Sequence, residues 1–225
     1  MDIDWPISFI TFLVFIIWGL VFYASLFEPP SEDLRTAMEG VANTVIENIS
    51  IEVTDLPVAA TTTLEEIKIL RLSYFFPSQN ARNSTKILVG GTSVPCQFFG
   101  DTVQWNDYLY YGTTHYTLRF ADKSVPQHCN AQVLIFGNTT QVDVGAAETK
   151  TMFSIAQINT MTNMSLGAFR TEHNINRNFK VEFNLSGTIT AFGPEPPPLS
   201  NVYVTERRGA LEEDESELHF RIFVW

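Results

Sequence analysis

The residues best suited to chemistry in this chain are four histidines and two cysteines. The histidines are His115, His128, His173 and His219. They share no metal-site spacing, and His128 with Cys129 and the distant Cys96 gives fewer ligands than a structural zinc ion takes. An even pair of cysteines instead favours one disulfide in an oxidising compartment. We therefore expect Cys96 and Cys129 to be bonded to each other.

The carboxylates offer no convergent acid–base pair. Glu65-Glu66 and Glu212-Glu213 are chain neighbours, and neighbours on a strand point to opposite faces, so neither pair suits a general acid and base. Solvated surface charge explains both pairs. The sequence also holds no P-loop, nucleophile elbow, dinucleotide fingerprint or zinc-protease helix. We expect a protein that is not an enzyme, with no cofactor and no metal.

Aromatic residues cluster in one short stretch of the chain. Trp105, Tyr108 and Tyr110 are followed by Tyr111 and Tyr116. Such a group suits a platform on which sugar rings stack, and equally suits ordinary packing within a tyrosine-rich hairpin. The platform reading makes glycans possible ligands.

Five Asn-x-Ser/Thr sequons indicate an exported surface that can carry N-linked glycans. Their asparagines are Asn48, Asn83, Asn138, Asn163 and Asn184. The net charge of −11, from 25 acidic against 14 basic residues, disfavours a nucleic-acid binder, which needs a basic stripe to neutralise phosphates.

The N-terminal segment predicts a membrane anchor over residues 1–30. Trp5 to Phe27 holds no charged residue, and a helix of that length spans roughly 34 Å, enough to cross a hydrocarbon core of about 30 Å. The acidic start and the length of the run differ from a signal peptide. No other apolar run reaches 18 residues, so we expect a single-pass protein.

One face of this predicted span carries small polar groups and an indole. Ser8, Thr11 and Trp18 share that face, and such groups gain little from contact with lipid. They are our candidates for packing against another helix. Facing lipid alone is the alternative.

Residues 31–50 predict an amphipathic stem helix. Leu34, Met38, Val41, Val45 and Ile49 recur at spacings of three and four. This stripe can pack on the chain's own β domain, or on copies of itself or a partner.

From residue 51 to 225 the apolar period becomes two, with short strands and frequent turns. The fold class is therefore mainly β: an antiparallel β-sandwich or Greek-key domain after the two helices. Residues 193–198 form a Pro-rich connector, and 150–164 fit a helix or a strand pair. Residues 218–225 predict a strand that completes the sheet or pairs with a neighbouring subunit.

This order of segments resembles archaeal single-span surface glycoproteins of type IV pilin-like or archaellum-accessory organisation. Ile7–Phe27 matches the apolar half of the pilin helix and Leu34–Ile49 its amphipathic half. The resemblance implies that the first helix anchors the protein and, in a filament, forms the core.

Three functions follow as hypotheses. The first is a non-enzymatic surface glycoprotein, structural or adhesive, with 31–225 extracellular, whose partners are the lipid bilayer and copies of itself or other surface proteins. The second is a membrane-tethered carbohydrate-binding or carbohydrate-active domain. The third is a single-pass accessory subunit of a larger membrane complex.

Overall fold

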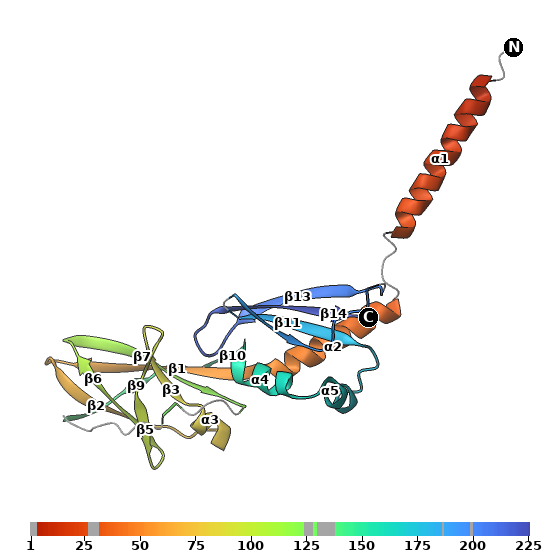
Figure 1. The fold of residues 1–225 in the computed structure, drawn as a ribbon. Helices are drawn as coiled ribbons and strands as arrows, with labels where there is room; N and C mark the ends of the chain where they lie inside the picture. Colours follow the sequence, from red (N-terminus) through yellow and green to blue (C-terminus); the bar gives the residue numbers. More distant parts are fainter. Residues whose placement is uncertain (1–3, 27–31, 124–127, 130–137, 186, 199) are drawn as a thin grey trace. The chain divides into compact units, whose positions relative to one another are not determined.

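The computed structural model describes all 225 residues except 1–3, 27–31, 124–127, 130–137, 186 and 199 (Figure 1). The chain divides into two compact units, Met1–Gly40 and Val41–Trp225. The first holds α1 (Asp4–Leu26) and the start of α2 (Glu32–Ile49). The second holds the end of α2 and every described strand. The fold is mainly β, and its sheets are antiparallel apart from the pair β2–β8.

α1 exposes apolar side chains along its described length. From Phe9 to Tyr23 every side chain is exposed, and Trp18 stacks on Phe22 with ring centroids 5.7 Å apart. Within the described residues, no helix combines the length and hydropathy that a membrane crossing requires. The membrane anchor over 1–30 therefore stays a prediction.

α2 covers the stretch predicted as a stem helix. Glu32 and Asp33 occupy its first turn, where the helix dipole favours negative charge. Val41, Ala42, Val45 and Ile49 are buried within the second unit. The helix passes directly into β1 at Ser50, so no linker separates the stem from the β structure.

Two sheets make a β-sandwich. The first runs β10-β1-β7-β3-β4 with β9 beside β1, and the second runs β5-β6-β2-β8. The strands of the first are β1 (Ser50–Thr62), β3 (Lys86–Val89), β4 (Thr92–Val94), β7 (Gly112–Ala121), β9 (Asp143–Val144) and β10 (Glu148–Phe153). Those of the second are β2 (Glu66–Ser73), β5 (Cys96–Phe99), β6 (Thr102–Leu109) and β8 (Asn138–Gln141), and the short helix α3 (Gln79–Asn83) follows β2. Alternate residues such as Val58, Leu70 and Leu118 fill the core between the sheets.

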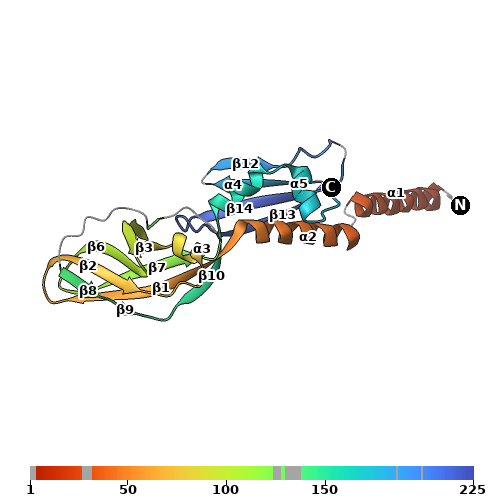
Figure 2. The same ribbon diagram turned by 90° about the horizontal axis from the view of Figure 1, so that it is seen from below.

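A third sheet is separate from the two sheets of the sandwich and has helices on one face (Figure 1, Figure 2). Its strand order is β12-β11-β14-β13. The elements are α4 (Ile155–Asn163), α5 (Leu166–Glu172), β11 (Phe179–Leu185), β12 (Thr188–Phe192), β13 (Tyr203–Ala210) and β14 (Glu217–Val224). Phe169 of α5 contacts Phe179 and Phe192 of the sheet, with ring centroids 5.9 and 5.5 Å apart. The predicted β region thus contains a sandwich and a separate helix-covered sheet.

The sandwich and the third sheet meet at the end of β10. Phe153 packs edge-on against Phe220 at 5.4 Å and forms a parallel bridge with Leu211. A methyl group at Gly209 would overlap the Phe153 ring, so this close approach requires glycine. The backbone N–H of Ser154 also donates to Ile49 O, which ties α2 to the same joint.

Two open sequence alternatives now have answers within the described chain. Residues 150–164, which fitted a helix or a strand pair, are the end of β10 followed by α4. The C-terminal strand β14 lies between β11 and β13 in the third sheet. Its apolar face, including Leu218 and Ile222, is buried. Residues 193–198 connect β12 to β13 without regular structure.

Candidate functional site

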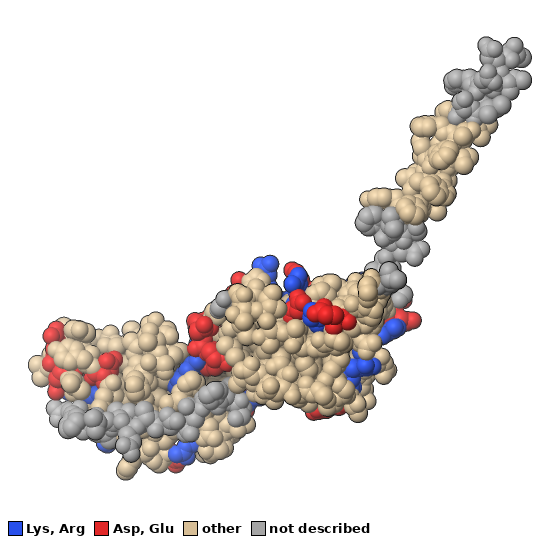
Figure 3. Space-filling view, in the orientation of Figure 1, with Lys and Arg blue, Asp and Glu red and all other residues tan. Residues whose placement is uncertain are grey.

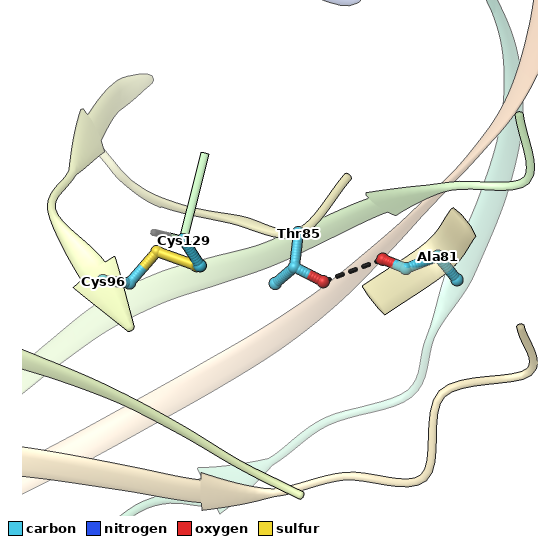
Figure 4. The surroundings of a disulfide bond; sticks show 4 residues. All are labelled: Ala81, Thr85, Cys96 and Cys129. Carbon is cyan, nitrogen blue, oxygen red and sulfur yellow. Dashed lines mark hydrogen bonds between the residues drawn. A yellow bond between two sulfur atoms is a disulfide. The ribbon is translucent and has the colours of Figure 1, made fainter. Parts of the chain in front are cut away.

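A disulfide joins Cys96 to Cys129 inside the sandwich (Figure 4). Cys96 begins β5, and Cys129 follows β7 in the chain. Both residues are buried in the sandwich core. Because the bond closes a loop of 33 residues, it restricts the unfolded chain and contributes about 3–4 kcal/mol to stability.

The predicted aromatic platform is wrong at Trp105. This side chain is fully buried between the two sheets, edge-on to the Tyr116 ring at 5.3 Å. Tyr108 and Tyr110 point outward instead, 46% and 67% exposed, with ring centroids 5.1 Å apart and planes at 72°. Positions 105 and 108 differ by an odd number, so strand alternation already places them on opposite faces.

The exposed tyrosines belong to a larger apolar group at one end of the sandwich, which we call the tyrosine tip. Its members are Leu64, Ile67, Tyr108, Tyr110 and Tyr111. The β1–β2 and β6–β7 connections both cross from one sheet to the other there, and Ile67 pairs with Tyr108 across β2 and β6. The sequence placed Tyr111, the most exposed member at 76%, in the same aromatic cluster, but it gave no sign of the two aliphatic members.

The end of the sandwich that carries the tip is acidic. Its strands and loops carry Glu65, Glu66, Asp107 and Asp143. Among the described residues of this end the one cation is Lys68, which pairs with Glu66 at 2.7 Å. Acidic side chains gather at this end in the space-filling view (Figure 3). The tip is therefore an apolar, aromatic surface in a negative field.

Asp107 links the tip to the core. Its carboxylate accepts hydrogen bonds from the Tyr116 hydroxyl and the Tyr108 backbone N–H, both at 2.8 Å. Burial, and then this carboxylate, raise the pKa of Tyr116 above its usual value. The Tyr116 hydroxyl therefore stays protonated and holds the β6 backbone beneath the exposed rings.

A second surface, which we call the arginine pocket, lies on the third sheet. It is a pocket of about 200 Å³ whose lining includes Arg207, Arg208, Arg221, His219, Ile189 and Glu206. Arg221 donates to Glu182 at 2.8 Å. A hydrogen bond from Lys180 and the nearby Arg221 lower the pKa of Glu182.

Arg208 is exposed, and its side chain makes no hydrogen bond or ion pair with any other residue that the structure describes. Arg207 donates only to Thr205 Oγ1 and Glu206 O within the same part of the chain. Since Arg221 and Glu182 offset each other, two guanidinium groups face a single carboxylate, Glu206, and the pocket is basic.

The acidic stretch between β13 and β14 is only partly a solvated turn: the sequence interpretation holds for the exposed Asp214 and Glu215 and is wrong for Glu212 and Glu213. Glu212 is 1% exposed, and its carboxylate lies 2.5 Å from the buried Lys86 Nζ of β3. Glu213 accepts a hydrogen bond from the Ile155 backbone N–H, the first residue of α4, at 2.7 Å. Burial raises the pKa of Glu213. This loop therefore clamps the third sheet to the sandwich.

A second ion cluster supports the clamp at the rim. The Arg119 guanidinium donates to both Asp55 oxygens at 2.6 and 2.8 Å and to Glu215 at 2.5 Å. Burial raises the pKa of Asp55, but hydrogen bonds from Arg119 and Lys150 outweigh it and hold the pKa below its usual value. The same guanidinium lowers the pKa of Glu215.

The sequon asparagines differ in their surroundings. Asn163 and Asn184 are exposed, at the end of α4 and in β11. Asn48 is half-buried, and its amide donates to Thr44 O and lies 3.3 Å from His173 Nε2. The side chain of Asn138 lies outside the described residues.

The sequon at Asn83 is held in a structured turn. The Thr85 side chain is fully buried, and its hydroxyl donates to Ala81 O at 2.8 Å (Figure 4). Asn83 itself accepts from Gln79. Of the described sequon side chains, Asn163 and Asn184 are thus the accessible glycosylation candidates.

The remaining candidates stay apart. The described residues contain no group of three or more His, Cys, Asp or Glu side chains placed to hold a metal. His219 lies 3.0 Å from Glu217, and burial lowers the pKa of the half-buried His128. On α1, Thr11 and Trp18 are exposed, and the side chain of Ser8 lies outside the described residues.

Comparison with known proteins gives no match: no family model, no curated protein and no solved structure is significantly similar to this chain.

We predict that Cys96→Ala/Cys129→Ala lowers the free energy of unfolding by about 3 kcal/mol, because the unfolded chain regains the entropy that the cross-link removes. Urea unfolding of the oxidised wild type and the double variant checks this. The reduced wild type should match the variant. Equal stability of all three would contradict the prediction.

Lys86→Met should destabilise the protein by roughly 3–5 kcal/mol, because it leaves Glu212 buried without its cation. Lys86→Met/Glu212→Leu removes both charges and should recover much of that loss. Arg71→Met, which removes an exposed cation on β2, is the matched control. A urea midpoint that moves no further for Lys86→Met than for Arg71→Met rules out the clamp.

The Arg119 cluster predicts a loss of stability in acid. A carboxyl with a lowered folded pKa stabilises the fold above its unfolded pKa of about 4, and this stabilisation disappears as pH falls through the folded pKa. Asp55→Asn should lower stability at pH 7 and flatten the pH dependence below about pH 5. Urea unfolding from pH 7 to pH 2 measures both, with the exposed Asp101→Asn as control. An unchanged profile would exclude Asp55.

Proposed function

We propose that this protein is a non-enzymatic, single-pass surface protein that α1 anchors in the cell membrane. Residues 31–225 lie outside the cell, where the disulfide-bonded β structure serves in a structural or adhesive assembly. The chain carries an N-linked glycan at the accessible Asn163, whereas Asn184 lines the arginine pocket and stays unmodified. Its partners are the lipid bilayer and copies of itself or other surface proteins.

The apolar surface of α1 carries this proposal. Its described large hydrophobic side chains occupy every side of the helix. Leu13 is the least exposed of them at 40% and Phe15 the most exposed at 67%. A helix that is apolar all round belongs in a protein core or a membrane. The uncharged sequence continues from this segment to Trp5 on one side and Phe27 on the other, a length suited to the bilayer.

The β unit supports an external location. A buried disulfide persists in oxidising compartments and is rare in the cytosol. Two sequons, at Asn163 and Asn184, present exposed asparagines. Both features agree with the resemblance to pilin-like surface glycoproteins, in which the N-terminal helix anchors the subunit and can form a filament core.

α1 is also our candidate for contact between subunits. Thr11 and Trp18 lie on the face predicted to pack against another helix, together with Ser8. Small polar side chains favour helix–helix packing in a bilayer because they permit close approach and interhelical hydrogen bonds. In this role the anchor belongs to the assembly as well as to the membrane.

A charge placed in α1 tests the anchor. Phe15→Arg/Ile16→Arg should move the protein from the membrane fraction to the soluble fraction, because each arginine costs about 2.5–3.5 kcal/mol at the centre of a span. Phe75→Arg, at an apolar side chain of the β unit that is 93% exposed, is the control and should stay membrane-bound.

External protease added to intact cells should digest residues 31–225. A wild-type protein found in the soluble fraction would contradict the anchor. Protection of the β unit in intact cells would contradict the external location.

A further inference from the structure

The tyrosine tip and the arginine pocket are complementary surfaces on one chain. The tip projects apolar rings within an acidic end of the sandwich, and the pocket is a hollow in which guanidinium groups outnumber carboxylates. We propose that the tip of one subunit docks into the arginine pocket of a second copy. This contact deepens the assembly role proposed above and rests on it.

The tip has the composition of an interface centre. Tyrosine offers a large, rigid, amphipathic surface at low entropic cost, and contiguous exposed apolar groups with a polar rim mark interaction sites. Tyr110 and Tyr111, 67% and 76% exposed, lie in the β6–β7 connection and are the most exposed members of the tip. The tip therefore supplies the protruding half of the contact.

The charge at the tip selects a cationic partner. Glu65, Asp107 and Asp143 have only Lys68 as a cation among the described residues of this end, and Lys68 pairs with Glu66. An anionic ligand such as a phosphate-bearing surface would be repelled. A guanidinium group gains from the carboxylates, and the faces of the tyrosine rings attract it as well.

The chain itself supplies that cation. Arg207-Arg208 is the only pair of adjacent basic residues in the sequence, and both line the pocket. Arg208 makes no ion pair within the described residues, so it can bind a new carboxylate without losing an existing one. Ile189, 60% exposed in the same pocket, offers an apolar contact to a tyrosine ring.

The two surfaces belong to different sheets, so the contact is heterologous: each subunit uses its tip toward one neighbour and its pocket toward another. Heterologous contacts build rings when the rotation closes and open filaments when it does not. A chain of subunits linked in this way extends a surface assembly beyond the membrane helices.

Directed disulfide formation between two full-length copies tests the contact. One copy carries Tyr111→Cys and one tag; the other carries Ile189→Cys and a second tag. Both are expressed together in membranes and oxidised, and we expect a cross-linked dimer that holds both tags. Phe99→Cys with Ile189→Cys is the matched control, because Phe99 is a similarly exposed aromatic (72%) at the end of β5.

Charge reversal adds a specific readout. Arg207→Glu/Arg208→Glu in the pocket copy should abolish the dimer, and Glu65→Lys in the tip copy should restore it. A dimer that forms equally with Phe99→Cys reflects random collision and overturns the proposal. So does a dimer between two Tyr111→Cys copies, which indicates a symmetric contact, and so does the absence of any dimer.

Membrane fractionation of the same cells distinguishes a failure of the tip–pocket contact from a failure of the proposed membrane anchor. Membrane-bound protein that fails to cross-link overturns the tip–pocket contact alone. Soluble protein that still cross-links with charge dependence contradicts the anchor alone.

Discussion

Two opposite charges, Lys86 and Glu212, lie almost fully out of water where the β13–β14 loop meets the sandwich. Removing either charge from water costs several kcal/mol, and only the partner offsets that cost. If the loop moved away from β3, Lys86 would stay buried without the carboxylate that offsets its charge. Glu213 at the start of α4 and Glu215 at Arg119 add two further contacts from the same loop. The placement of the third sheet depends on this loop.

The path of the chain reinforces the clamp. α2 continues into β1 without a linker, β1 pairs with β10, and β10 leads directly to α4. The sandwich and the third sheet thus share a continuous backbone from β10 to α4, and the β13–β14 loop bonds to this same stretch through Glu212 N–H to Phe153 O. A covalent connection and a set of buried polar contacts therefore hold the third sheet to the sandwich at one joint.

Local patterns in the sequence predicted the elements well, and contacts between distant residues poorly. The three- and four-residue spacing from Leu34 to Ile49 marked α2, and strict alternation from Leu218 marked β14. The alternation of inward and outward side chains along β6 could also have predicted that Trp105 is buried and Tyr108 exposed. Nothing local distinguishes Glu212 from solvated acids, because its partner Lys86 lies 126 positions away. Burial of that loop depends on the tertiary fold, as does the separation of the third sheet from the sandwich.

The overall charge also constrains how copies can meet. A chain with a net charge of −11 repels its copies, and at physiological ionic strength this repulsion is screened beyond about 8 Å. Attraction must then act at contact range, between patches of opposite sign. The acidic tip and the basic pocket meet that condition, and two tips or two pockets do not. The same charge distribution that keeps separate subunits apart therefore favours one orientation, tip to pocket, once two copies come within contact range.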